Sequence, residues 1–161
     1  DGMVNALLLN LGIISERINW LNDPSTAKAV IIIGLIWRWT GYNMVFFLSG
    51  MQGIEYSIYE AARIDGANQF QQLIKITIPL LKPIILVTGI MSTNGTLQLF
   101  DESVNLTRGG PSNTTITMSH YIYNKMFVGN PNFGYAAAMS FVILIMVAIL
   151  SAIETKVGDK R

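Results

Sequence analysis

Three long apolar stretches constrain this chain more than any other feature of its sequence. They cover residues 27–50, 80–100 and 133–153. Each is long enough to cross the roughly 30 Å hydrocarbon core of a bilayer as a helix. Of the 161 residues, 51% are hydrophobic and only 13% are charged, whereas soluble domains average about 25% charged residues. The sequence therefore predicts an all-α membrane protein with three spans.

Composition also excludes several classes of function. The net charge of +1 does not favour nucleic acid as a partner, and a chain without cysteine has neither a disulfide framework nor a thiol metal site. The single histidine, His120, cannot build a histidine metal cluster. The chain begins with Asp1 and shows no signal segment, so we expect a piece of a longer polypeptide.

The remaining residues divide into connecting segments. We expect residues 1–26 to be an external interfacial segment, with a turn at Asn22–Ser25 and with Ser25 or Thr26 capping the first span. Residues 101–132 are expected to be an external loop with a short helix within 112–127, and residues 154–161 a cytoplasmic tail.

Charge sets the expected orientation, because loops rich in lysine and arginine stay in the cytoplasm. The larger basic group comprises Arg63, Lys75, Lys82, Lys156, Lys160 and Arg161. The smaller group comprises Arg17, Lys28, Arg108 and Lys125. The loop at residues 51–79 is therefore expected to be cytoplasmic.

This polar loop has the local chemistry of two short helices joined at a glycine. Ser57 and Glu60 have the spacing of a capping box, and Gly66 stands where a helix end favours positive φ. Asn68 with Gln71 is expected to cap the second helix. Pro79 and Pro83 are expected to stop that helix, with Pro83 opening the next one. These are the helix-start and helix-stop roles that each residue type favours.

The loop also carries a longer pattern. Glu60-Ala61-Ala62 is followed after three residues by Gly66, and after nine more by Ile76-Thr77-Ile78-Pro79. This pattern resembles the signature loop of permease subunits of bacterial ABC importers, with Ile78 where leucine is usual. The fuller run Ile58–Ala67 resembles the carbohydrate-uptake branch, the maltose, lactose and glycerol-phosphate type. Further resemblance to that branch lies in residues 37–42, in Leu106–Pro111 and in Phe133-Gly134.

The resemblance implies a fold, a role and partners. The fold is the helical bundle of a type I ABC importer transmembrane domain, of which this chain would be the C-terminal half. The bundle would lie in the bacterial cytoplasmic membrane and move sugar without catalysis of its own. Its partners would be a cytoplasmic ABC ATPase dimer, a second permease and an extracellular or periplasmic sugar-binding protein. The chain binds no cofactor in this interpretation, and the ATPase uses ATP and magnesium.

The resemblance also assigns residue roles. Glu60 would face a basic group of the ATPase, Ala61 and Ala62 would allow close contact, and Gly66 would make the turn. The full ATPase-coupling set is Glu60, Ala61, Ala62, Asp65, Gly66, Ile76 and Pro79. Positions that line the sugar path in maltose-type permeases correspond here to Trp37, Gly41, Met44, Ser92, Gly95, Thr96 and Leu99. The alternative is a structural permease that docks the ATPase without touching substrate.

The spans themselves hold polar groups that need partners. Arg38 either pairs with a neighbour or lines the pathway. In the second span, one polar stripe is predicted to line a path and the other to meet a partner subunit, or all five residues bond within the helices. The two stripes are Thr88, Ser92 and Thr96 on one side, and Asn94 and Gln98 on the other. An intramembrane enzyme using Asp101, Glu102 or His120 is disfavoured, because these residues lack metal or nucleophile spacing.

Overall fold

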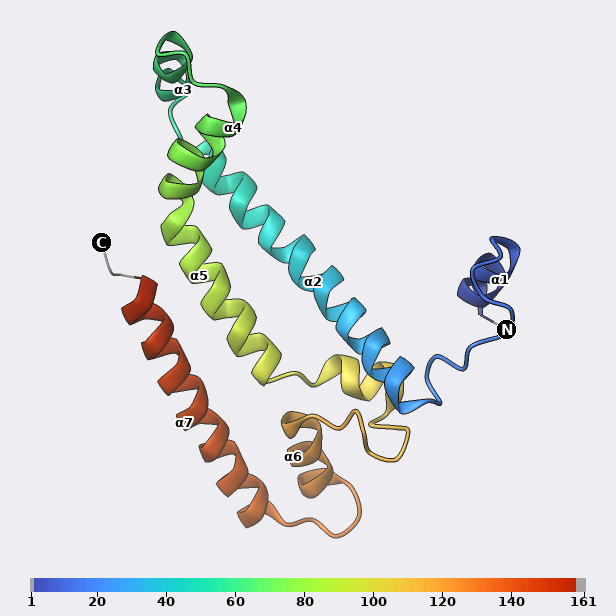
Figure 1. Ribbon diagram of the computed structural model, residues 1–161. Coiled ribbons are helices and arrows are strands. Elements are labelled where there is room, and N and C mark those ends of the chain that lie inside the picture. Colours follow the sequence, from blue (N-terminus) through green and yellow to red (C-terminus); the bar gives the residue numbers. More distant parts are fainter. Residues whose placement is uncertain (1, 159–161) are drawn as a thin grey trace.

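The computed structural model describes residues 2–158, and every regular element among them is helical. Figure 1 shows three long helices joined by shorter ones. In chain order the elements are α1 Met3–Asn10, α2 Pro24–Gln52, α3 Tyr56–Ile64, α4 Gln69–Gln72, η1 Leu73–Thr77, α5 Ile78–Leu97, η2 Ser103–Thr107, α6 Met118–Phe127 and α7 Phe133–Gly158. The predicted tail residues Lys160 and Arg161 lie outside the described residues.

The three helices long and apolar enough to cross a membrane cover Pro24–Gln52, Gln69–Leu97 and Phe133–Gly158. α5 lies between α2 and α7, and consecutive long helices run in opposite directions (Figure 1). The predicted all-α fold with three spanning helices is confirmed. The boundaries differ from the predicted ones, because α2 begins before residue 27 and α7 runs past residue 153.

The start of α2 corrects one prediction. Asp23, rather than Ser25 or Thr26, is the N-cap, and Pro24 occupies the first helical turn. The Asp23 carboxylate accepts hydrogen bonds from the backbone amides of Ser25 and Thr26 at 3.0 and 3.1 Å. The side-chain hydrogen bond from Ser25, followed by the bond from the Thr26 amide, lowers the pKa of Asp23. Pro24 suits the first turn because its missing N–H has no helical partner there.

The prediction that Pro79 and Pro83 stop a helix is wrong. The chain is helical without a break from α4 through η1 into α5. The π turn η1 widens the helix just before the prolines, and the Ile78 amide bonds back to the Leu73 carbonyl. Pro79 then falls in the first turn of α5, and Pro83 lies inside α5. A local π turn is one of the adjustments that let membrane helices tolerate proline.

Two polar side-chain pairs connect the three long helices. Asn43 of α2 donates to the Ser92 hydroxyl of α5 at 3.1 Å. Asn94, on another side of α5, donates to Ser151 of α7 at 3.0 Å. Helices in a membrane lack a hydrophobic force between them, so such bonds and close packing hold them together.

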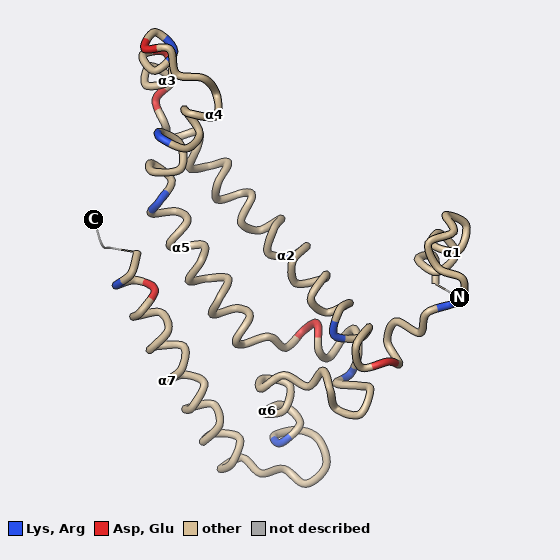
Figure 2. Tube along the Cα trace, in the orientation of Figure 1, with Lys and Arg blue, Asp and Glu red and all other residues tan. Residues whose placement is uncertain are grey.

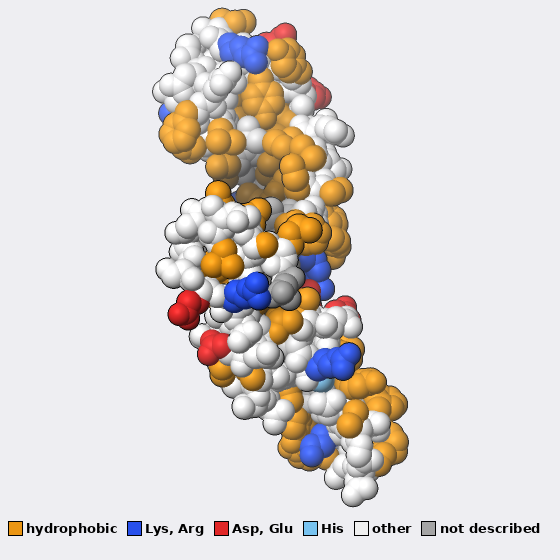
Figure 3. All heavy atoms as spheres, turned by 90° about the vertical axis from the view of Figure 1, so that its right-hand side faces the viewer, with side chains coloured by type: hydrophobic (Ala, Val, Ile, Leu, Met, Phe, Trp, Pro, Cys, Tyr) orange, Lys and Arg blue, Asp and Glu red, His pale blue; other side chains and the backbone are white. Residues whose placement is uncertain are grey.

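Small residues bring the same helices into close contact. A Cβ on Gly95 of α5 would lie 2.3 Å from the Trp39 ring of α2, so the indole occupies the space that a side chain would need. A Cβ on Gly50 of α2 would similarly meet Ile84 of α5 at 2.1 Å. The bundle is thin, and many large apolar side chains remain on its outer faces, where they form the patches in Figure 3.

The segment after α5 folds around a buried hydrogen-bonded centre. The Ser103 hydroxyl donates to the Thr115 carbonyl at 2.6 Å and lies 2.7 Å from the His120 ring. His120 is 5% exposed and packs within this segment, and burial lowers its pKa. The helix expected within 112–127 begins only at Met118, because Ser112 and Asn113 adopt positive φ.

The N-terminal segment lies apart from the bundle in Figure 1. α1 is tied to the chain that follows it by one side chain. Asn5 donates to the Ile18 carbonyl at 2.9 Å and accepts from the Trp20 indole at 2.8 Å. Its predicted interfacial position stays a prediction.

The Gly95–Trp39 contact generates a test. We expect Gly95→Ala to lower the melting temperature of the detergent-purified protein, because overpacking a tight contact costs about 1–3 kcal/mol. Gly89→Ala on the same helix is the matched control, since a Cβ there would meet nothing within 4 Å. Equal melting temperatures for the two variants would show that the Trp39 contact does not limit the packing of α2 on α5.

Candidate functional site

The polar loop projects beyond the ends of α2 and α5 (Figure 1). α3 begins at Tyr56 with Glu55 as its N-cap, and no side chain caps it. The predicted capping box of Ser57 and Glu60 is therefore wrong, because Ser57 already lies in the first helical turn. The Ser57 hydroxyl instead donates to the Glu55 carboxylate at 3.3 Å.

The turn after α3 confirms the role predicted for Gly66. Its φ of +80° is left-handed, and the Ala67 amide donates across it to the Ala62 carbonyl at 2.9 Å. The second capping box is also confirmed. The Asn68 side chain accepts from the Gln71 amide, the Gln71 side chain accepts from the Asn68 amide, and both distances are 2.9 Å.

Two side-chain contacts fasten this loop to the base of α5. The Tyr59 hydroxyl of α3 lies 2.8 Å from the Thr77 hydroxyl of η1. The side-chain amide of Gln72 donates to the backbone carbonyl of Ala67 at 2.9 Å. Gln72 and Thr77 are both buried. α3, the Gly66 turn and the start of the middle span therefore form one braced unit.

The predicted coupling residues are mostly accessible on this unit. Glu60, Ala61, Asp65, Gly66 and Pro79 are exposed, whereas Ala62 and Ile76 are partly buried. Figure 2 marks both acidic and basic residues along the chain trace at this end of the molecule.

The structure adds three exposed apolar side chains that sequence reasoning did not assign to the coupling surface. Tyr56 is 59% exposed, Ile64 86% and Phe70 69%. Phe70 lies in the short helix α4 and is exposed there although it is apolar. The Arg63 guanidinium lies 5.6 Å from the centre of the Tyr56 ring and donates to the Tyr56 hydroxyl at 3.0 Å.

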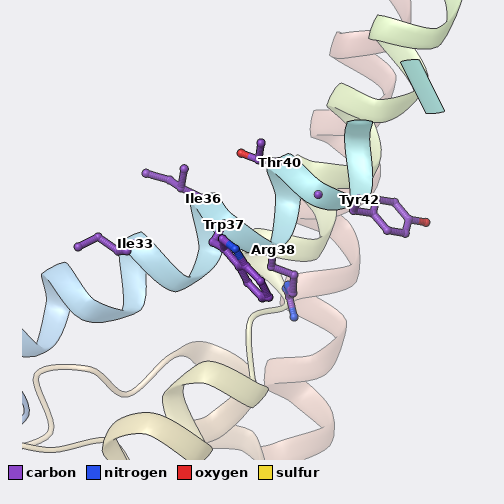
Figure 4. A pocket seen from close by; sticks show the side chains of 7 residues that line it. Ile33, Ile36, Trp37, Arg38, Thr40 and Tyr42 are labelled. Carbon is purple, nitrogen blue, oxygen red and sulfur yellow. The ribbon is translucent and has the colours of Figure 1, made fainter. Parts of the chain in front are cut away.

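The substrate-path candidates on α2 lie on its outward face. Trp37 is 81% exposed and Met44 58%, and no atom would crowd a Cβ on Gly41 within 4 Å. Trp37 and Gly41 line an open hollow of about 740 Å³, which Figure 4 shows along α2. The complete lining is Ile33, Ile36, Trp37, Arg38, Thr40, Gly41 and Tyr42.

The candidates on α5, and Leu99 just beyond its end, have a different environment. The Ser92 hydroxyl is hydrogen-bonded to Asn43, and the Trp39 ring packs directly on Gly95. Leu99 is buried. Thr96 alone of this set is exposed, and its hydroxyl donates to the Ser92 carbonyl at 2.8 Å. The described residues therefore do not bring the two sets of candidates together around one cavity.

The polar stripes of the second span mostly find partners within the chain. Thr88 donates to the Ile84 carbonyl at 2.8 Å, and Ser92 and Asn94 bond to α2 and α7. The Asn94–Ser151 bond agrees with the alternative that these polar residues bond within the helices. A contact between a polar stripe and a partner subunit stays a prediction. Gln98 lines a separate hollow between α6 and α7.

Arg38 has a counter-charge in the structure. Its Nη1 atom lies 2.9 Å from a carboxylate oxygen of Glu102, which follows α5. The guanidinium also lies 5.4 Å from the centre of the Trp39 ring. An ion pair offsets the cost of about 2.5–3.5 kcal/mol that an arginine carries at the centre of a membrane helix.

No group of three or more histidine, cysteine, aspartate or glutamate side chains within residues 2–158 is arranged to hold a metal ion. The described residues offer an exposed polar loop and an open face of α2.

Comparison with known proteins identifies the class that this arrangement defines. The family described as the binding-protein-dependent transport system inner membrane component matches residues 3–159, and the chain belongs to that family. With its three spanning helices, the chain is a multi-pass component of the inner, cytoplasmic membrane.

Several relatives carry the names of sugar transport systems. The lactose transport system permease protein of Rhizobium radiobacter is 56% identical over 163 residues, which cover 100% of this chain and 55% of the relative. The arabinooligosaccharides transport system permease protein of Bacillus subtilis is 35% identical, with coverage of 97% and 49%. The trehalose/maltose transport system permease protein of Thermococcus litoralis is 36% identical, with coverage of 99% and 53%. The chain spans about half the length of these relatives.

Solved structures share the fold. The crystal structure of a bacterial ABC transporter involved in the import of the acidic polysaccharide alginate matches with a TM-score of 0.84 and 24% identity, covering 98% of this chain and 54% of that one. The alginate transporter in complex with a pentasaccharide-bound periplasmic protein matches with a TM-score of 0.73. The arrangement of helices is therefore that of an ABC importer transmembrane domain.

The Gly66 turn generates a test of loop rigidity. We expect Gly66→Ala to speed amide hydrogen exchange across residues 61–68 about fivefold to thirtyfold, because left-handed backbone costs a side-chain-bearing residue about 1–2 kcal/mol. Gly53→Ala is the matched control, since Gly53 has a φ of −77°. Unchanged exchange in the Gly66 variant would show that the turn carries no such constraint.

Proposed function

We propose that this chain is part of a permease subunit of an ATP-driven sugar uptake system. The carrying observation is that α3 is braced through Tyr59 and Thr77 to the helix that continues into the middle span. A body that docks on α3 therefore has a direct mechanical path into the membrane. Family membership and the sugar permeases among the relatives support this role.

The mechanism follows from that connection. A pair of ABC ATPases closes when ATP and magnesium bind, and each docked loop moves with its ATPase as a rigid body. Because Gln69–Leu97 is one helix, displacement of α3 shifts α5. The hydrogen bonds of α5 to α2 and α7 pass the movement on, and the bundle changes from inward-facing to outward-facing.

The loop surface fits a protein partner. Exposed Glu60 offers a carboxylate to a basic group, and Ala61 leaves room for a close approach. Tyr56, Ile64 and Phe70 add apolar area around them, as the centre of an interface requires. The coupling set Glu60, Ala61, Ala62, Asp65, Gly66, Ile76 and Pro79 therefore docks a cytoplasmic ATPase.

The other partners are a second permease and a sugar-binding protein on the external side. The exposed apolar outer face of α7 is suited to lipid and to further membrane helices. The family description itself names dependence on a binding protein. The larger basic group of loop residues places α3 on the cytoplasmic side.

The substrate class is a sugar, and the path follows α2. Trp37 offers an indole face on which the CH groups of a sugar ring stack, beside the open backbone at Gly41. Met44 and Thr96 are exposed on α2 and α5. Ser92, Gly95 and Leu99 contribute through the packing that positions α2 against α5.

A second candidate is a structural permease that docks the ATPase without touching substrate. It is favoured by the engagement of Ser92, Gly95 and Leu99 in helix packing. We expect Trp37→Ala and Met44→Ala to alter the relative uptake of different sugars by the complete transporter. Uptake ratios identical to those of the wild type, with the complex intact, would favour the structural role.

The docking role has its own test. We expect Glu60→Lys to uncouple ATP hydrolysis from uptake in the reconstituted transporter, because the reversed charge repels the basic group of the ATPase. Glu16→Lys is the matched control, since Glu16 is exposed in the segment before α2. Both variants should insert normally, and sugar uptake per ATP should fall only for Glu60→Lys. Coupled transport at the normal rate by that variant would contradict the docking role.

A further inference from the structure

Arg38 is held in place from two sides. Its Nη1 atom bonds to a Glu102 oxygen at 2.9 Å, and its guanidinium lies 5.4 Å from the centre of the Trp39 ring. Trp39 is itself fixed, because its ring fills the space above Gly95. The guanidinium of Arg38 thus has little freedom to move.

The two partners differ in their access to solvent. The Glu102 side chain is 12% exposed, and its second carboxylate oxygen is buried without a hydrogen-bond partner within the described chain. The Arg38 side chain is 41% exposed and lines the hollow beside Trp37 and Gly41. Glu102 therefore supports the guanidinium from behind, and Arg38 presents it to the open side.

A gain in the stability of the fold is not enough to explain the ion pair of Arg38 and Glu102. An ion pair with one buried partner is often no more stabilising than apolar residues of similar volume. A planar guanidinium has five N–H donors, and the bond to Glu102 involves only its Nη1 end. The remaining donors need acceptors in a region that is otherwise apolar.

The hollow combines these donors with an exposed ring. Figure 4 shows the side chains of Trp37 and Arg38 extending from the same side of α2. Adjacent hydroxyls of a sugar can accept two parallel N–H bonds from a guanidinium fork, and the CH face of the sugar can stack on the indole. Because Glu102 neutralises Arg38, a neutral sugar fits better than an anionic one, which would be repelled by that carboxylate.

We propose that Arg38 is a sugar-binding residue of the translocation path, donating to a pair of neighbouring hydroxyls, and that Glu102 is its positioning residue. This inference rests on the proposed function and names the ligand chemistry of the α2 face. The charge of Arg38 thus serves recognition, and its neutralisation by Glu102 makes that charge tolerable inside the membrane.

The test uses the complete transporter, with full-length permeases, ATPase and binding protein, in proteoliposomes. The probes are a transported sugar and its monodeoxy analogues, each supplied with saturating binding protein. For the wild type, removal of one of the two bound hydroxyls should lower uptake about tenfold, as expected for a lost hydrogen bond to a charged group. Arg38→Lys keeps the charge but loses the fork, so it should abolish that discrimination between sugar and analogue.

A charge swap separates recognition from structure. Arg38→Glu combined with Glu102→Arg restores an ion pair, so the complex should assemble and hydrolyse ATP as the wild type does. Its sugar uptake should nevertheless fall at least tenfold, because the fork is displaced to the other side of the pair. Asp101→Asn, which changes the exposed neighbour of Glu102, is the control and should leave uptake unchanged.

Three results would overturn these assignments in distinguishable ways. Wild-type uptake and analogue discrimination in the swapped variant would reduce the pair to a structural contact. Wild-type discrimination in Arg38→Lys would remove the guanidinium fork from sugar recognition. Failure of the wild-type transporter to take up any sugar would instead contradict the proposed function itself.

Discussion

The unbroken helix from Gln69 to Leu97 is the constraint on which the rest of this structure depends. Two prolines would ordinarily end such a helix, but the π turn at Leu73–Thr77 changes the register immediately before them. The same π turn supplies Thr77, to which Tyr59 is bonded. One local distortion therefore both continues the span and anchors the polar loop to it.

Polar contacts then determine how the spans pack. Each long helix offers its neighbour an amide, a hydroxyl or a glycine, as the pairs Asn43–Ser92 and Asn94–Ser151 show. Such contacts suit a bundle in lipid, where apolar surface alone does not select one helix face over another. Because of these contacts, the substrate-path candidates Ser92 and Gly95 of α5 lie against α2. The residues that line the open hollow, in contrast, all come from α2.

The ion pair of Arg38 and Glu102 is a further polar contact between α2 and a distant part of the chain, formed by charged side chains. It joins the middle of α2 to Glu102, the N-cap residue of η2, and a Cβ on Gly34 of α2 would lie 3.8 Å from Leu106 of η2. The buried Ser103–His120 contact then fixes the segment beyond. The segment between α5 and α7 is thus a folded unit fastened to the spans.

The sequence by itself determined the features that depend on neighbours in the chain. The apolar stretches, the left-handed Gly66 and the Asn68–Gln71 box followed from length, backbone preference and short spacing, and the family followed from the loop motif. Only the tertiary structure decided what lies far apart in sequence. The partner of Asn43 is 49 residues away, and that of Asn94 is 57 residues away. No local rule selects such pairs, because they depend on how the helices are aligned and rotated once packed. The Ser57–Glu60 box and the stop at Pro79 were wrong for a related reason, since the loop geometry and the π turn overrode local preference.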